Sequence, residues 1–572
     1  MFKPLKLLAM VCLIAGCPGW ATQGSARADE PSPLKGLRLN DLRLLPTQSG
    51  GRLKPFDEFA RENLLAITGS RTFGGFDPAE MLISMMVNPK EWGEVRMIRI
   101  SVPEVNQQLL LESSRKYFSA SELLSSNAFL QYSNSIQSNG TAGEQVTDTG
   151  VNAVTGKADP RSEELKRVVD RVARFQAIVT GRLWAITPAR DEAGKEKWKT
   201  VAEGMMESSP QSQAVFEILK NYLDRNPEAV NASFAKARLA IESGITDFEG
   251  HRSRVLAETF YNRLRPFLQA MIFYLIAGIL WLFAGAHAFP RIMSKFLTIC
   301  AVTLHALGFA LRCYVAGRPP VTNMYESIIW VSLGVMVFAV LLFLKNRQNV
   351  LMTTATFLSG LALFAADSAP MVMDPTIRPL VPVLRSNYWL TIHVLTITLS
   401  YGAFMLAMGI ANVALWCFYE ISKKGETRAI SERIALLNQL AYRALMFGTV
   451  LLAAGTILGG VWADYSWGRF WGWDPKEVWA LIALLSYMAV LHGRYAGWVG
   501  KFAFPLWTVI CFSTVVMAWY GVNFVLGVGL HSYGFSTGGQ AFVFGFLLLQ
   551  TTFCIFVAIH HKGLKWIPSS GN

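Results

Sequence analysis

The chain has 572 residues, of which 52% are hydrophobic and only 16% are charged. Soluble globular proteins carry about 25% charged residues, so this composition argues against a soluble protein and indicates a protein with several membrane-spanning segments. The net charge of +13 would suggest nucleic-acid binding in a soluble protein. Lysines and arginines that fix membrane topology explain a large part of it here, so we expect membrane lipid and no nucleic acid as a partner.

Residues 1–28 are typical of a signal peptide. Lys3 and Lys6 precede the apolar run LLAMVCLIAG, and Ala26-Arg27-Ala28 has the small-residue pattern of a cleavage site. A second interpretation takes Ile14-Ala15-Gly16-Cys17 as a lipobox, which would make Cys17 a lipidated N-terminus. A third interpretation is that this segment is not cleaved and stays in the membrane as an anchor. In each case we expect the residues that follow to be exported.

Residues 29–266 are expected to form an exported soluble domain. Hydrophobic periodicity at 161–182 and 211–243 predicts amphipathic helices, and the polar, glycine-bearing stretch at 134–160 predicts a linker. The domain is therefore predicted to be mostly helical. Its residues show no catalytic constellation.

From residue 267 to 572 the sequence changes to apolar runs of about twenty residues, the length that crosses a bilayer as a helix. The predicted spans are 268–289, 295–315, 324–344, 349–366, 388–418, 438–460, 477–493, 502–522 and 541–560. The predicted fold class is an all-α polytopic membrane protein with about nine transmembrane helices after the exported domain. Cytoplasmic connections collect lysine and arginine. The predicted inner connections carry twelve of these residues and the outer ones six, which indicates an inner C-terminus.

The segment 461–476, which we name the tryptophan loop, joins the sixth and seventh predicted spans on the outer side. The candidate ligand-binding residues of this loop are Trp467, Trp471, Trp473 and Asp474, and Trp479 follows in the next span. Indole rings offer flat apolar faces and a polar N–H, so the loop is suited to a flat hydrophobic ligand. The alternative is an aromatic belt at the membrane surface. Such a belt would account for scattered tryptophans, but it does not account for several of them in one short segment.

Two histidines are predicted on the same side as the tryptophan loop. His393 lies just inside the fifth span, and His531 lies in the connection between the last two spans. Neutral imidazole is a common axial ligand of heme iron, and the porphyrin ring is flat and apolar. The sequence therefore predicts a heme b site with His393 and His531 as candidate iron ligands. Since no CxxC occurs, the chain is not expected to attach a c-type heme to itself.

The run Trp467-Gly468-x-x-Trp471-x-Trp473-Asp474 resembles the WWD signature of heme-handling proteins. Four further segments are similar to the CcsA/ResC branch, which serves cytochrome c biogenesis of the second type. They are GRPPVTNMYES at 317–327, NYWLTIHVLTITLSYGAF at 387–404, SYMAVLHGR at 486–494 and GLHSYGF at 529–535. The resemblance covers residues 295 to 560.

This resemblance implies a bacterial plasma-membrane component of holocytochrome c synthase that works with a ResB/CcsB-type subunit. Such a complex takes heme from the inner side and joins it to the CxxCH cysteines of an apocytochrome c outside, so heme lyase activity is implied, either of this chain or of the complex only. The exported domain and the tryptophan loop would lie on the periplasmic side.

The resemblance also implies His492 as a ligand of a second heme held within the bilayer. For the opposite ligand His305 is preferred over His287, and a histidine of the partner subunit is the other possibility. Tyr325 and Glu326 either contact the heme edge or the apocytochrome, or belong to a helix start capped by Asn323. A respiratory membrane subunit carrying b-type hemes is the alternative function, although such a subunit would pair its histidines at comparable depth.

Overall fold

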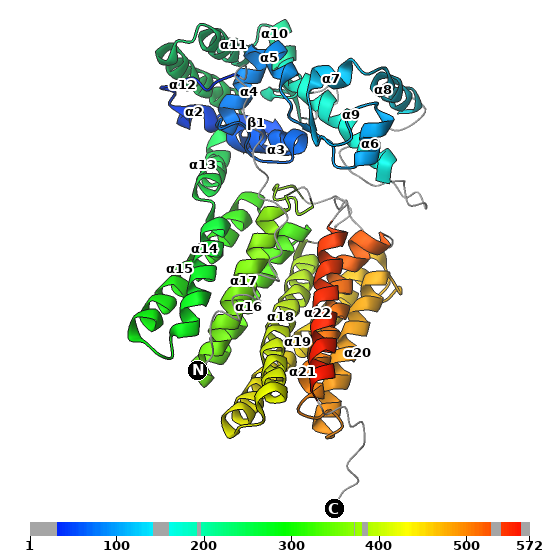
Figure 1. The fold of residues 1–572 in the computed structure, drawn as a ribbon. Helices are drawn as coiled ribbons and strands as arrows, with labels where there is room; N and C mark the ends of the chain where they lie inside the picture. The colour runs from blue at the N-terminus through cyan, green and yellow to red at the C-terminus, as the bar shows by residue number, and fades with distance from the viewer. Residues whose placement is uncertain are drawn as a thin grey trace, which may run out of the picture.

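The computed structural model describes residues 31–140, 160–190, 196–370, 372–379, 387–527 and 539–561. The predicted signal peptide, residues 141–159 of the predicted linker and His531 lie outside these residues. The described residues form two separate apolar cores. One lies in the N-terminal domain that is predicted to be exported, between Leu42 and Ile241, and the other in the membrane region, between Tyr261 and Val557. We keep the name exported domain for the first part on the basis of that prediction. Figure 1 shows the exported domain at one end of the bundle of long helices.

Up to residue 244 the exported domain contains eleven described helices and two small sheets, while the last residues of its predicted range, 248–264, form the helix α13 that continues into the first membrane span. The helices are α2 Leu39–Arg43, α3 Phe56–Thr68, α4 Pro78–Val87, α5 Pro89–Glu94, α6 Pro103–Gln108, α7 Ala120–Leu124, α8 Asn127–Gly140, α9 Pro160–Val179, α10 Val201–Met206, α11 Pro210–Leu223 and α12 Pro227–Gly244. Three of them begin with a capping side chain followed by proline: Asp77, Ser209 and Asn226 each accept a bond from a backbone N–H of the first turn. Such starts lower the cost of the unpaired N–H groups.

The helices predicted at 161–182 and 211–243 are present, but the second is divided. Its pattern continues from α11 into α12, while Arg225 has a left-handed φ of 52° and Pro227 starts the next helix. Proline disfavours helical backbone in the residue before it, which explains the break. The first residues of the predicted linker, 134–140, are helical and form the last part of α8.

The sequence did not predict the sheets. β1 Pro46–Ser49, β2 Arg52–Pro55, β5 Ala185–Arg190 and β6 Glu196–Thr200 form an antiparallel sheet in the order β2-β1-β5-β6. β3 Ile98–Arg99 pairs with β4 Tyr117–Phe118. The exported domain is thus mixed helix with a little sheet. Strands of two to six residues are too short for a clear alternating pattern.

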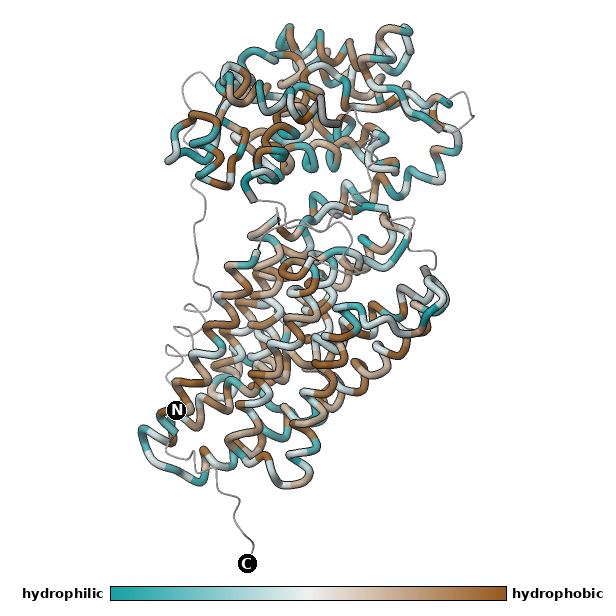
Figure 2. Tube along the Cα trace, turned by 90° about the vertical axis from the view of Figure 1, so that its right-hand side faces the viewer, coloured by the Kyte–Doolittle hydropathy of each residue, from teal (hydrophilic) through white to brown (hydrophobic). Residues whose placement is uncertain are grey.

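Nine helices of the described residues are long and apolar enough to cross a membrane, which confirms the predicted fold class. Their elements are α13 Phe248–Leu264 continuing into α14 Pro266–Phe283, α15 Ala288–Ala316, α16 Met324–Asn346, α17 Asn349–Ser368, α18 Asn387–Lys424, α19 Arg428–Trp467, α20 Pro475–Tyr495, α21 Ala503–Val516 continuing into the π-helix η1 Met517–Leu526, and α22 Gln540–His560. Figure 2 shows hydrophobic residues concentrated along these helices.

Several spans are longer than predicted, and the two longest helices are α18 and α19. α18 and α19 have 38 and 40 residues, which corresponds to about 57–60 Å of helix, roughly twice the hydrocarbon thickness. They therefore extend beyond the bilayer. α19 ends at Trp467 and α20 starts at Pro475, so residues 461–467 of the predicted loop are helical and residues 468–474 connect the two helix ends at one end of the bundle.

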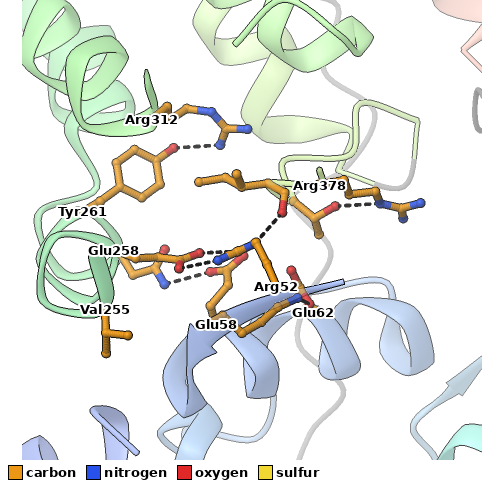
Figure 3. Close-up of polar contacts among 12 residues, drawn as sticks. Arg52, Glu58, Glu62, Val255, Glu258, Tyr261, Arg312 and Arg378 are labelled. Carbon is orange, nitrogen blue, oxygen red and sulfur yellow. Dashed lines mark hydrogen bonds and ion pairs between the residues drawn. The ribbon is translucent and has the colours of Figure 1, made fainter. Parts of the chain in front are cut away.

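A mostly buried ion pair and a buried hydrogen bond join the exported domain to the helices (Figure 3). The Arg52 guanidinium donates two hydrogen bonds, of 2.7 and 2.6 Å, to the carboxylate of Glu258 on α13, and its Nε donates to the Ile377 carbonyl at 2.9 Å. Asn262 Nδ2 donates to Glu58 Oε2 at 2.7 Å. Burial raises the pKa of Glu58, but the charges of Arg71 and Arg52 lower it further, so that the net pKa is below its usual value. The two parts of the chain are therefore held by charge-assisted bonds.

A second buried cluster continues this junction into the helices. Glu326 has no exposed surface, and its two oxygens accept bonds from Arg312 at 2.9 Å and Arg318 at 3.2 Å. Arg312 also donates to the Pro375 carbonyl at 2.9 Å. Asn323 Oδ1 accepts from the Glu326 N–H at 2.8 Å, so the predicted helix cap is confirmed. Residues 372–379, which precede α18, thus lie at the end of the bundle nearest the exported domain.

Candidate functional site

His393 lies near the start of α18, at the same end of the bundle, and packs closely on α19. Its Nδ1 lies 2.7 Å from the Gly455 carbonyl oxygen. A carbonyl only accepts, so Nδ1 carries the proton and, in the neutral ring, Nε2 carries the lone pair. A ligating histidine needs this arrangement, in which one ring N–H bonds a backbone carbonyl and the other nitrogen faces the metal.

Two glycines on α19 make this close approach possible. A Cβ at Gly459 would lie 2.6 Å from His393 Cε1, and a Cβ at Gly455 would lie 2.9 Å from the Ile397 backbone. Any larger residue would therefore push α18 away or turn the imidazole. Small residues four positions apart allow helices to approach each other closely in membranes. Here Gly455 and Gly459 form the surface of α19 that His393 contacts, which we name the seat of His393.

Trp462 completes the seat, although the sequence analysis did not identify it. Its ring lies parallel to the His393 imidazole, with centroids 6.3 Å apart and planes within 7°, and only 1% of the residue is exposed. Trp467 packs edge-on against Trp462 at 4.7 Å. A continuous aromatic path therefore leads from His393 through Trp462 to Trp467 at the end of α19. The spacing of Gly455, Gly459 and Trp462 on one helical face was the signal that could have revealed it.

The tryptophan loop itself is fixed by the start of α20. Asp474 caps this helix by accepting from the Lys476 N–H at 3.0 Å, and Glu477 Oε2 accepts from the N–H groups of Gly472 at 2.8 Å and Asp474 at 3.2 Å. Asp474 is buried. The capping box therefore holds the backbone of residues 472–474, and the structure gives Asp474 a structural task in addition to any contact with a ligand.

The other tryptophans of the cluster are accessible. Trp471 and Trp473 pack edge-on with centroids 5.9 Å apart. Trp473 is 71% exposed and has a left-handed φ of 56°. A bulky aromatic residue in this conformation is uncommon and tends to occur where the surroundings require it. Trp479 is partly buried in the first turns of α20. An exposed indole at the rim is available for a ligand or a protein partner.

His492 lies at the other end of α20 from the tryptophan loop. From Asp474 to His492 the distance along the helix is roughly 27 Å at about 1.5 Å per residue. His492 is exposed in the last turn, and its Nδ1 donates to the Met488 carbonyl at 2.7 Å. Its Nε2 is therefore also the lone-pair nitrogen of the neutral ring. The structure does not bring His492 and His393 together, so they can only serve separate sites.

His305 has the contacts of a core residue. It has no exposed surface, its Nε2 donates to the Ile329 carbonyl at 2.9 Å, and its Nδ1 accepts from the Tyr274 hydroxyl at 3.3 Å. Both ring nitrogens thus have protein partners. His287 is exposed at the residue before α15. Neither lies beside His393 in the described residues, and the pairing of His393 with His531 stays a prediction because His531 lies outside them.

Comparison with known proteins gives the family. Residues 321–531 match the family model described as Cytochrome C assembly protein. The chain is 33% identical over 294 residues to the cytochrome c biogenesis protein CcsA of Prochlorococcus marinus, covering 46% of this chain and 92% of that protein. It is 34% identical over 273 residues to CcsA of Synechococcus, covering 42% of this chain and 84% of that one.

A longer match extends into the exported domain. The chain is 29% identical over 500 residues to the protein NrfI of Wolinella succinogenes, covering 84% of this chain and 53% of NrfI. The region from residue 266 onward is little more than half of the chain, so this match includes a large part of the exported domain. The chain spans about half the length of NrfI. On the CcsA matches and the fold together, the chain belongs to the CcsA family of cytochrome c biogenesis proteins.

Proposed function

We propose that the protein presents heme at the outer face of the bacterial plasma membrane for covalent attachment to apocytochrome c. The observation that carries this proposal is the seat of His393, whose Nδ1 is bonded to the Gly455 carbonyl at 2.7 Å. This bond selects the tautomer that ligates iron through Nε2. Heme b is the cargo, and His531 is the proposed second axial ligand.

The tryptophan loop supports the ring of the cargo in this proposal. Trp471 and Trp473 provide apolar faces, and the capping box of α20 holds the loop that carries them. Positioning of bound reactants is enough to lower the barrier of a reaction between two groups. The chain's task is then to hold the porphyrin with its vinyl edge accessible, while polar groups pair with its propionates.

The attachment step needs no further reactant. The histidine of the apocytochrome's CxxCH motif displaces one of the two protein imidazoles from the iron. Each cysteine thiol then adds across a vinyl C=C bond, so that the sulfur bonds to one vinyl carbon and the proton ends on the other. Two thioether bonds form, and no electrons are gained or lost overall. The protein contributes orientation rather than chemistry to this addition.

The inner end of the bundle holds the second proposed heme position. His492 presents Nε2 as the lone-pair nitrogen in the last turn of α20. We propose that a ResB/CcsB-type subunit supplies the opposite histidine, because both nitrogens of His305 already have protein partners. The excess of positive residues in the predicted inner connections supports an orientation with His492 inside and with the exported domain and the tryptophan loop outside.

The test is to replace His393 with alanine in the full-length protein. The proposal predicts that heme co-purified with the protein falls to the amount held elsewhere, and that maturation of a reporter cytochrome c stops. His251→Ala, in an exposed position of α13, is the control and should change neither. A His393→Ala protein with a normal heme content that still matures the cytochrome would exclude the ligand role. A reversible reduced-minus-oxidised heme spectrum together with maturation that does not need the protein would instead indicate electron transfer.

A further inference from the structure

Arg443 lies inside a membrane span and is bonded to an amide instead of a carboxylate. It belongs to the predicted span 438–460 and lies about 22 Å from the start of α19 at about 1.5 Å per residue. Its Nη1 donates to Oδ1 of Asn346, the last residue of α16, at 2.6 Å. The ion pairs of α18 and α19 in the described residues, Lys424–Glu420 and Arg428–Glu432, do not include it. A charged side chain in a span is costly and usually has a function.

The bond to Asn346 places Arg443 at the boundary of the hydrocarbon. α16 begins beside the buried cluster of Glu326, at the end of the bundle nearest the exported domain, and runs for 23 residues, or about 34 Å. The hydrocarbon core is about 30 Å thick, so the far end of α16 reaches the opposite membrane surface. Figure 1 shows α18 and α19 extending beyond the end of α16 there. The Arg443 guanidinium is therefore held on a helix at the depth of lipid phosphates.

Two more cations lie beside this guanidinium. Lys345 and Arg347 flank Asn346 along the chain, and both are exposed. The ion pairs of α16 in the described residues involve Glu326, at its other end. Asn346 Nδ2 donates to the Leu342 carbonyl at 2.7 Å, which turns its Oδ1 toward Arg443. A guanidinium has five N–H donors, and Asn346 takes one of them. Three positive charges, one of them fixed in place, thus meet at the end of α16.

Next to these cations, α16 and α19 expose apolar side chains on the outside of the bundle. Both helices pack on α18, and Phe338 and Phe447 join them with ring centroids 5.8 Å apart. From Arg443 to Ile457 the exposed face of α19 is about 21 Å long, which exceeds one leaflet of the hydrocarbon, about 15 Å. The exposed residues recur at helical spacing on one face of each helix. They are Val337, Leu341 and Leu344 on α16, and Phe447, Val450 and Ile457 on α19.

We propose that this surface, which we name the α16–α19 surface, binds an anionic phospholipid of the membrane leaflet opposite the exported domain. Arg443 donates to the lipid phosphate, Lys345 and Arg347 lie beside it, and the acyl chains lie along the exposed faces of α16 and α19. Basic sites between membrane helices are suited to such headgroups. A cation that only marks topology needs neither a fixed guanidinium nor an apolar face beside it. The proposal does not rest on the proposed function.

The test is photo-crosslinking to lipid. Leu344, which is 57% exposed, is replaced by a phenylalanine that carries a diazirine. The purified full-length protein is reconstituted in vesicles of equal parts phosphatidylglycerol and phosphatidylcholine with the same acyl chains, and mass spectrometry after irradiation gives the ratio of the two lipid adducts. Ile276, which is 43% exposed on α14, is the control position, because residues 269–283 carry no charge. The proposal predicts about tenfold enrichment of phosphatidylglycerol at position 344, the effect of one good hydrogen bond to a charged group, and none at position 276.

Substitutions of Arg443 show whether this residue causes the enrichment. Arg443→Gln should abolish the enrichment at position 344, and Arg443→Lys, which keeps the charge, should retain most of it. Arg428→Gln removes an exposed cation at the start of α19 and should change nothing. If Arg443→Gln fails to fold, Lys345→Gln and Arg347→Gln together take its place. Because each basic residue near an anionic membrane surface contributes to lipid binding, this double variant should lower the enrichment about fivefold or more.

Four results would overturn the proposal. One is equal enrichment at positions 344 and 276, and another is an enrichment that neither Arg443→Gln nor the double variant lowers. An equal loss with Arg428→Gln would show a diffuse attraction of the surface and no site. Enrichment that an excess of inorganic phosphate removes would show a site for the free anion and not for a lipid. Heme is absent from all of these measurements, so their outcome leaves the proposal for His393 unchanged.

Discussion

The imidazole of His393 and the indole of Trp462 lie parallel, with planes within 7° and centroids 6.3 Å apart. Trp462 is buried, and Gly459 lies so close to the imidazole that an added Cβ would be 2.6 Å from Cε1. The orientation of His393 is thus set by its neighbours before any ligand binds. A site held in this way loses less entropy on binding.

Gly459→Ala should disturb the site through the imidazole. The added Cβ would lie 2.6 Å from His393 Cε1, so the ring must turn away from the position that its bond to Gly455 defines. We expect heme retention to fall about tenfold, and the overpacking to cost about 1–3 kcal/mol. Heme per protein after purification measures the first effect. Gly500→Ala, where an added Cβ meets open space, should behave like the unaltered protein, and equal retention in both variants would show that the seat is unimportant.

Asp474→Asn should preserve the tryptophan loop, because asparagine caps helices about as well as aspartate. Asp474→Ala removes the cap and should cost about 1 kcal/mol, with weaker heme retention as Trp471 and Trp473 lose their fixed backbone. Thermal unfolding and heme content of the two variants distinguish the role of Asp474 as a helix cap from a role of its negative charge. If the asparagine variant loses heme as the alanine variant does, the negative charge of Asp474 contributes directly to the ligand site.

Glu326→Gln should destabilise the end of the bundle beneath the exported domain. Arg312 and Arg318 would share no carboxylate there, and removing one partner of a buried ion pair costs about 3–5 kcal/mol. Unfolding of the detergent-purified protein measures the loss. Glu432→Gln breaks only the exposed pair with Arg428 and should have little effect. Equal stability of the two variants would contradict the assignment of Glu326 as a buried anchor.

Acid should loosen the exported domain through Glu58. Its folded pKa is below the usual 4.5, so its contribution to stability is complete above that value and is lost as the pH falls through the folded pKa. Burial raises the pKa of Glu62, so its contribution is present below 4.5 and is lost as the pH rises through the raised pKa. Glu58→Gln should therefore flatten the loss of stability as the pH falls below 4.5, and Glu62→Gln should steepen the loss of stability as the pH falls toward 4.5 from above.

Hydrogen exchange of α3, corrected for the pH dependence of the intrinsic rate, measures both slopes in the full-length protein. Identical slopes in the two variants would show that these carboxyl groups are not coupled to folding.

The sequence predicted those features that depend on local composition. The number of spans follows from the runs of apolar residues. The order of the spans along the chain then predicts that the tryptophan loop and His393 lie at the same end of the bundle. The strands β1 and β5 are separated by more than a hundred residues and have four and six residues, so no local pattern indicates their pairing. The contact of His393 with Trp462 depends on how α18 and α19 are rotated, and the Arg443–Asn346 bond joins positions 97 residues apart. Such contacts are decided by packing and not by periodicity.

The central claim is that His393 binds the iron of heme at the outer face, and the most direct measurement is the absorption spectrum of the purified protein. The unaltered protein should show the spectrum of a heme with two axial imidazoles. His393→Ala should lose this spectrum, and added imidazole should restore it together with part of the cytochrome c maturation, because a free imidazole can fill the vacated position. An unchanged spectrum in the His393→Ala protein, with no response to imidazole, would contradict the claim.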